Sequence, residues 1–175
     1  MPSGAFVVTS NVDGQFQKAG FSENNILEIH GSIHRLQCME PCRETVWSAQ
    51  SVKPLVDHRC EWIGNTLPTC DRCHKLARPN ILMFDDWGWI GMRAEVQRAS
   101  QQIWSNLART QVVIELGAGV DIPSIRRISE NQGCPVIRIN PRHSHLPEGT
   151  GVSFAMSAKE TLKAIAIELE KLGFF

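Results

Sequence analysis

The sequence has 175 residues, of which 42% are hydrophobic and 21% are charged, and this balance is typical of one compact globular domain with a sizeable core. The same composition excludes collagen-like, coiled-coil and disordered chains. Eighteen basic and eighteen acidic side chains give a formal net charge of zero, so no overall field favours nucleic acid or an anionic membrane. No apolar run approaches the ~20 residues of a membrane span and no export signal is visible, which predicts a cytoplasmic protein.

The first predicted elements are a buried strand, a short apolar stretch and a long helix. The strand, Ala5–Thr9, begins almost at the first residue, as if the chain started in the middle of a fold. The apolar stretch is Ile26–Ile29, and the helix is predicted over Ala94–Leu107. Apolar residues recur along that helix at the spacing of one face: Val96, Ala99, Ile103 and Leu107.

The second half of the chain predicts a βαβ unit. Strand Val112–Leu116 is followed by a helix near Ser124–Asn131 and by strand Val136–Ile139, an order that implies a parallel sheet. A last helix begins at Ser157, because Ser157 and Glu160 match a capping box ahead of an apolar stripe. The expected fold is therefore α/β, with a partial parallel Rossmann-type sheet.

Two short-spaced cysteine pairs bound a segment of little helical or strand periodicity. The pairs are Cys38 with Cys42 and Cys70 with Cys73, and two such knuckles can complete a closed four-sulfur shell around a structural zinc ion. Zinc would supply the folding free energy that a segment without a core of its own lacks. The expected organisation is an inserted zinc-ribbon-like module at 38–73 within a Rossmann-type domain formed by 1–37 and 74–175.

Other interpretations of these residues stay open. Cys70 to His74 also satisfies the C-x-x-C-H pattern of covalent haem attachment, although haem would leave the first cysteine pair without a purpose. His34, His58 or His74 could each replace a thiolate at the metal. The remaining cysteines, Cys60 and Cys134, are expected to be buried free thiols.

Polar side chains at predicted strand ends are the candidates for ligand binding. Thr9–Gly14 follows the first strand, where open α/β folds bind ligands, but an Asx turn explains the same residues. Gly117–Gly119 has only part of the G-x-G-x-x-G fingerprint. Asn140 ends the next strand about twenty residues on, where dinucleotide folds place a ribose-binding group. His30 is either a general base or a structural histidine bonded to backbone.

In this order, these segments resemble the sirtuins, the NAD-dependent protein lysine deacylases. Val8–Gly14 resembles the family's T-Q-N-I-D-x-L, Leu27–Ser32 its E-L-H-G, and the paired cysteines its zinc module. Leu76–Phe84 resembles L-R-P-x-V-V-x-F. Glu115 to Pro123 stands in the place of G-T-S-L-x-V-x-P, and Val136–Asn140 in that of V-x-x-I-N. The match extends from about Phe6 to Ala158.

The resemblance implies a role for each segment. Asn11 and Asp13 would hold the nicotinamide-side ribose of NAD, and Ser10 would also bind the cofactor. His30 would take a proton from a ribose hydroxyl so that the acyl group of lysine passes to ADP-ribose. Two further groups would bind the cofactor: Gly117, Ala118 and Gly119, and Asn140, Pro141 and Arg142. Ile81, Leu82, Met83 and Phe84 would pair with an acyl-lysine peptide as an added strand.

Several positions depart from the family pattern. Arg142 stands where an acidic residue is common, Asp85-Asp86 where Gly-Glu is usual, and small hydroxyl residues of the loop after Leu116 are replaced by Ala and Gly. The family's first half, with its Gly-rich phosphate loop and first strand, is missing. A truncated reading frame is therefore expected, with a partner chain or the missing segment completing the sheet. The alternatives are an NAD hydrolase and a non-catalytic, zinc-stapled interaction module.

Overall fold

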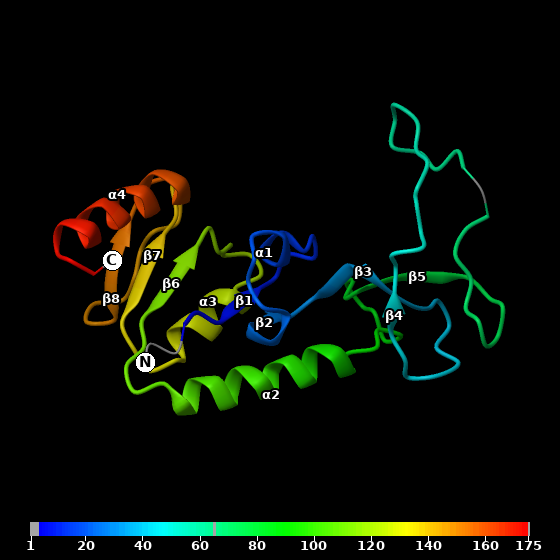
Figure 1. Cartoon of the computed structure of the whole chain (residues 1–175), viewed down its shortest axis with the longest axis horizontal. Coiled ribbons are helices and arrows are strands. Elements are labelled where there is room, and N and C mark those ends of the chain that lie inside the picture. The colour runs from blue at the N-terminus through cyan, green and yellow to red at the C-terminus, as the bar shows by residue number, and fades with distance from the viewer. Residues whose placement is uncertain (1–3, 65, 175) are drawn as a thin grey trace. The chain divides into compact units, whose positions relative to one another are not determined.

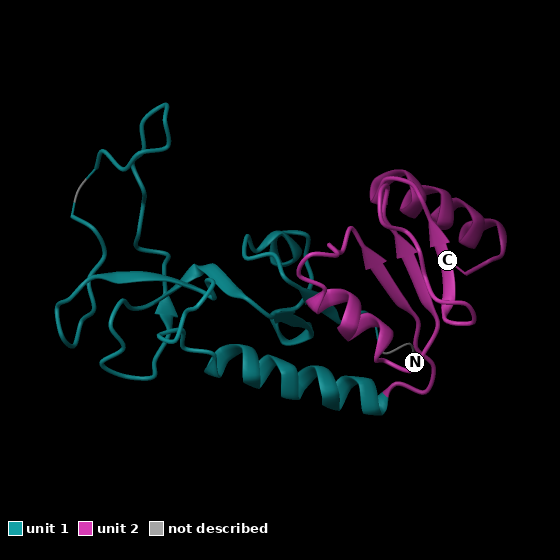
Figure 2. Cartoon of the chain, turned by 180° about the vertical axis from the view of Figure 1, so that it is seen from behind, with its two compact units in different colours: residues 1–107 teal, residues 108–175 magenta. Residues whose placement is uncertain are grey.

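The computed structural model describes residues 4–64 and 66–174, and the chain divides into two compact units, 1–107 and 108–175 (Figure 2). The first three residues of the expected domain 1–37 lie outside the described residues. The boundary between these two units does not coincide with the expected boundaries of a Rossmann-type domain and an inserted module. That expected division stays a prediction. Each unit has its own sheet structure and is described separately.

The first unit contains two small sheets and one long helix. Strand β1 (Val7–Thr9) pairs in parallel with β2 (Ile26–Glu28), and β3 (Gly31–Cys38) pairs antiparallel with both β4 (Trp47–Ser48) and β5 (Ala77–Ile81). The helical elements are α1 (Gln15–Lys18), the 3-10 turn η1 (Glu23–Asn25) and α2 (Met92–Leu107). Apolar side chains of β2, Ile26 and Leu27, are each only 1% exposed and form the centre of this unit's core.

The connection from β2 to β3 depends on Gly31. Its φ is +81°, a conformation that L side chains rarely adopt, and a Cβ there would lie 2.0 Å from the backbone oxygen of Asn80 on β5. Only glycine therefore allows β5 to approach the start of β3. The side chain of Asn80 is buried and donates to Gln37 Oε1 at 2.8 Å and to the backbone oxygen of Ile90 at 3.0 Å.

Helix α2 forms where it was predicted, but its buried face was predicted wrongly. It packs on β2 and η1 through Gln97, whose Oε1 accepts the backbone N–H of Glu28 at 3.1 Å, and through Arg93, which pairs with the buried Glu28 carboxylate at 2.7 Å. The predicted apolar stripe stays exposed, with Ile103 62% and Leu107 75% accessible. The polar partners of Glu28 determine which face of α2 is buried. The spacing of apolar residues along the helix cannot predict those partners.

The second unit is a three-stranded parallel sheet with two helices (Figure 1). Its strands run in the order β6 (Val113–Leu116), β7 (Val136–Ile139) and β8 (Gly151–Phe154), and α3 (Ser124–Glu130) packs against β6. This confirms the predicted βαβ unit. Helix α4 (Ala158–Lys171) starts as predicted, because Ser157 Oγ accepts the backbone N–H of Glu160.

Within the described ranges, no helix combines the length and the apolar composition that a membrane crossing needs.

Candidate functional site

In the first unit, the loops after β1 and β2 carry the predicted ribose-binding and base residues. The loop after β1 is held as an Asx turn, since Asp13 Oδ1 accepts the backbone N–H of Gln15 at 3.1 Å. The backbone oxygen of Val12 accepts the N–H of Ile33 at 2.9 Å, which fixes this loop to β3. Ser10 is half-buried, and the Asn11 side chain is exposed and makes no hydrogen bond to the described part of the chain. The turn therefore shapes the loop and leaves the Asn11 amide available.

His30 lies between β2 and β3 with a half-buried side chain. Its imidazole makes no hydrogen bond to any described residue, so backbone bonding, the structural alternative, does not account for it. Its backbone oxygen accepts the N–H of Leu82 at 3.0 Å, which brings the predicted base beside the predicted peptide-binding segment. A half-buried imidazole without an internal partner is free to exchange a proton with a bound ligand.

The predicted peptide-binding segment begins at the last residue of β5, Ile81, and leaves the sheet. Met83 and Phe84 are 61% and 84% exposed, and Trp87 is 97% exposed, so a row of large apolar side chains faces solvent. Asp86 fixes the turn beneath them: it pairs with Arg78 at 2.8 Å and accepts the backbone N–H of Met83 at 3.4 Å. The departure at Asp85-Asp86 thus has a structural role.

The four predicted metal ligands come together at the ends of β3 and β5. The sulfurs of Cys38, Cys42, Cys70 and Cys73 all lie within 4.8 Å of one another. The Cys38–Cys73 distance is 3.5 Å and the Cys42–Cys70 distance is 3.7 Å. Zn–S bonds of about 2.3 Å in a tetrahedron place the sulfurs about 3.8 Å apart, so the cluster fits one zinc ion.

The surroundings of two of these thiols shift their pKa values in opposite directions. Backbone N–H groups of Cys73 and Arg72 lower the pKa of the Cys70 thiol to about 7. Burial, together with hydrogen bonds from the other three sulfurs, raises the pKa of Cys42 to about 12. Four thiolates at this spacing repel one another, and a bound dication removes that repulsion.

The segment between the two knuckles has no core of its own, as predicted. None of the described residues between 39 and 69 is buried. The expectation for the two extra cysteines was wrong: Cys60 is exposed and Cys134 is half-buried. Cys60 occupies a left-handed turn position, with φ 62°, in a loop that has no interior in which to bury it. Among the described residues, the cluster contains no histidine, so His34, His58 and His74 do not replace a thiolate.

In the second unit, the predicted cofactor-binding residues follow β6 and β7. Gly117 has φ +63°, and neither Gly117 nor Gly119 would bring an added Cβ within 4 Å of another atom. Neither the backbone conformation nor the packing of the chain requires a glycine at position 119. A glycine that the fold does not require favours close approach of a ligand to the backbone of this loop. Asn140 donates to the backbone oxygen of Ala118 at 3.0 Å and accepts from the N–H groups of Arg142 and His143. One amide hydrogen of Asn140 remains for a ribose.

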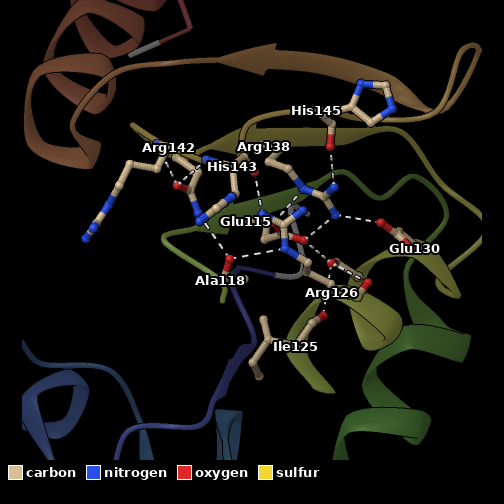
Figure 3. Close-up of polar contacts among 11 residues, drawn as sticks. Glu115, Ala118, Ile125, Arg126, Glu130, Arg138, Arg142, His143 and His145 are labelled. Atoms are coloured by element: carbon tan, nitrogen blue, oxygen red, sulfur yellow. Dashed lines mark hydrogen bonds and ion pairs between the residues drawn. The ribbon is translucent and has the colours of Figure 1, made fainter. Parts of the chain in front are cut away.

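A buried charge network beside these loops was not predicted (Figure 3). Arg138 on β7 pairs with Glu115 on β6 at 2.6 Å and with Glu130 of α3 at 2.7 Å. The side chains of Arg138 and Glu115 are 2% and 0% exposed. The sequence signal for this network was one charged residue within each of two apolar strands, V-I-R-I and V-I-E-L. Because these two strands pair in the sheet, the two opposite charges can neutralise each other.

The sequence profile described as the Sir2 family matches residues 3–124, which is more than half of the chain. The chain belongs to the Sir2 family. Sir2 proteins are the sirtuins, so the resemblance in the motifs is confirmed.

Similar Sir2 proteins cover nearly all of this chain, but the chain covers only part of them. An "NAD-dependent protein deacylase" of Aquifex aeolicus is 27% identical in an alignment of 173 positions that covers 96% of this chain and 64% of the relative. A solved Sir2 homolog–NAD complex is 24% identical with a TM-score of 0.64, covering 95% of this chain and 59% of the other. A Sir2–p53 peptide–NAD+ structure is 21% identical with a TM-score of 0.59, covering 97% and 64%. The chain thus has the Sir2 fold and spans less than two thirds of these relatives.

Proposed function

We propose that this chain carries the acyl-transfer site of a Sir2-type NAD-dependent protein lysine deacylase. The observation that carries the proposal is the half-buried His30 imidazole, which has no hydrogen-bond partner among the described residues and lies at the parallel strand ends beside Leu82. A general base needs such a position, and the protein deacylases and NAD complexes among the relatives support the assignment of the reaction.

The proposal gives each loop one task. NAD, when bound, supplies the electrophilic ribose carbon to which the acyl oxygen of lysine adds as nicotinamide leaves. Ser10, Asn11 and Asp13 orient the ribose next to that carbon, and the uncommitted Asn11 amide can donate to or accept from a hydroxyl. His30 would accept the proton of a ribose hydroxyl, whose oxygen then bonds to the acyl carbon. Lysine would leave as the free amine, and water would supply the oxygen that completes acyl-ADP-ribose. The loops at Gly117–Gly119 and Asn140–Arg142 hold the adenosine end.

The proposed substrate is a protein or peptide that bears an acylated lysine. Ile81–Phe84 leaves β5 in an exposed, apolar conformation next to His30, and an extended peptide can pair with such a segment as an added strand. A p53 peptide is bound in one of the similar Sir2 structures. The NAD-hydrolase alternative needs no such segment.

The remaining parts of the proposal concern zinc, location and the rest of the sheet. Zinc would be structural, because four cysteines fill its tetrahedron and leave no position for water. The proposed location is the cytoplasm, because its reducing conditions keep closely spaced cysteines as free thiols. In the described part of the chain, β1 and β6 each pair with a strand on one side only. A further segment or a partner chain would complete the pairing at these edges.

The test is nicotinamide release from NAD by the purified, zinc-loaded chain, with and without an acetyl-lysine peptide. We expect release that depends on the peptide and that falls roughly 10²–10⁴-fold in His30→Ala. The zinc content and the unfolding midpoint of that variant should not change, and His58→Ala, at an exposed histidine, serves as the matched control.

Three results would contradict the proposal in different ways. Release that is independent of peptide would indicate the hydrolase. No release from the zinc-loaded chain would favour the interaction module. Unfolding of His30→Ala would make this histidine structural.

A further inference from the structure

The two loops that carry the predicted adenosine-side residues follow neighbouring strands of the second unit. The loop after β6 contains Gly117, Ala118 and Gly119, and the loop after β7 begins at Asn140. Because β6 and β7 pair in parallel, both loops leave the sheet at the same end, where α/β folds bind ligands. A ligand that contacts both loops needs them at a fixed separation.

The loop after β6 has little stiffness of its own. Glycine has more backbone freedom than any other residue, and a glycine lies on each side of Ala118. The start of the loop is held by the Gly117 N–H, which donates to the backbone oxygen of Ile139 at 2.9 Å. Beyond that bond, the hydrogen bonds from residues 117–119 to the described part of the chain are those of the Ala118 oxygen.

Arg126 of α3 joins the two loops (Figure 3). Its Nε–H donates to the backbone oxygen of Ala118 at 3.1 Å, and a second N–H donates to the backbone oxygen of His143, in the loop after β7. Asn140 donates to the same oxygen of Ala118 at 3.0 Å. The guanidinium of Arg126 is thus a bridge between the loops, and the Asn140 amide adds a second link between them.

This bridge is separate from the buried charge network beside it. Arg138 pairs with the buried carboxylate of Glu115, so removal of Arg138 would leave a buried charge without its partner. Arg126 is half-buried, and in the described ranges it has no acidic partner. Substitution of Arg126 therefore removes the two loop contacts without leaving a carboxylate unpaired, and its role can be tested in a folded chain.

We infer that Arg126 is a positioning residue for the adenosine end of the dinucleotide, because it holds the loops after β6 and β7 in one arrangement before the ligand binds. A loop that is already ordered loses less conformational entropy on binding, and this difference increases the affinity. The inference rests on the proposed function for the placement of the adenosine end at these loops. It predicts that Arg126 changes the affinity for the cofactor and not the rate of the chemical step.

The first test measures binding of adenosine 5′-phosphate to the whole zinc-loaded chain by calorimetry. We expect Arg126→Gln to bind this probe about tenfold more weakly. Arg126→Lys should be weakened nearly as much, because one ammonium nitrogen keeps the charge but lacks the fork of donors that contacts both oxygens. Arg127→Gln is the matched control and should keep its affinity, since Arg127 is the next residue of α3 and is exposed.

A second measurement separates positioning from general stability. In nicotinamide release, Arg126→Gln should raise the KM for NAD about tenfold and leave kcat at saturating NAD within about twofold. A purely structural role would instead reduce the fraction of folded chain, which lowers the apparent kcat and leaves KM unchanged.

Each contrary result overturns the inference in its own way. Equal affinity of Arg126→Gln and the unsubstituted chain for adenosine 5′-phosphate would reject the positioning role and leave the deacylase proposal standing. Full affinity in Arg126→Lys would show that the charge, and not the bridge, is what the ligand needs. A lowered kcat with an unchanged KM would make Arg126 structural. Absence of binding to the unsubstituted chain would reject the placement of the adenosine end at these loops, and the inference with it.

Discussion

At the scale of single residues, Asp86 controls the shape of the exposed segment that follows β5. Its side chain is 11% exposed and that of its partner Arg78 is 15% exposed. Burial alone would raise the pKa of Asp86, but the hydrogen bond and charge of Arg78 and the N–H of Met83 outweigh burial and lower it. The ion pair is thus favourable in the folded chain, and it ties Met83 to the turn.

The pH dependence of stability follows from that lowered pKa. A carboxyl group whose pKa is lower in the folded state stabilises the fold above its unfolded pKa, near 3.9, and loses this contribution as the pH falls through the folded value. We expect the free energy of unfolding to decline below about pH 4 and to decline less steeply in Asp86→Asn. Chemical denaturation at a series of pH values measures both slopes. Equal slopes in the two proteins would show that Asp86 does not contribute.

Gly119 offers a residue-scale test of cofactor approach. Because an added side chain meets no atom within 4 Å and its φ is not in the left-handed region, Gly119→Val should change the free energy of unfolding by less than about 0.5 kcal/mol. If the backbone of this loop faces the dinucleotide, the same substitution should weaken ADP-ribose binding about tenfold or more. Calorimetry of the folded variant measures this loss. Unchanged affinity would place the cofactor elsewhere.

At the scale of elements, the two cysteine knuckles hold the ends of β3 and β5 together. Cys38 is the last residue of β3 and faces Ala77 at the start of β5. We expect Cys38→Ser to lose the bound zinc on dialysis and to become sensitive to protease between residues 39 and 69, where no described residue is buried. Cys60→Ser is the control, because Cys60 is exposed and lies outside the cluster, and it should retain one ion per chain. Zinc retention in Cys38→Ser, measured by elemental analysis, would contradict this assignment.

The elements also show what the sequence can and cannot predict. The strand Val136–Ile139 and the cap at Ser157 were predicted at the residues where they occur, because both depend on local patterns. The clustering of the four cysteines was predicted because their spacing alone indicates a metal site. The sequence could not predict the buried face of α2 or the Glu115–Arg138 pair, because each depends on a partner more than twenty residues away in sequence.

At the scale of the whole molecule, the candidate site residues belong to two units. The ribose-side loops, the base His30 and the peptide segment lie in residues 1–107, whereas the adenosine-side loops lie in residues 108–175. The family was recognisable because short motifs kept their order along the chain, and the Sir2 profile confirms it. The roles of the individual site residues stay predictions, and the chain spans 64% of a deacylase relative.

The most direct measurement follows the acyl group itself. Mass spectrometry of a reaction containing the zinc-loaded chain, NAD and a peptide with an isotopically labelled acetyl-lysine would identify the product that carries the label. The proposed deacylase activity predicts labelled acetyl-ADP-ribose in amounts equal to the deacetylated peptide and to free nicotinamide. Labelled free acetate formed without nicotinamide, or nicotinamide formed while the peptide keeps its label, would contradict it.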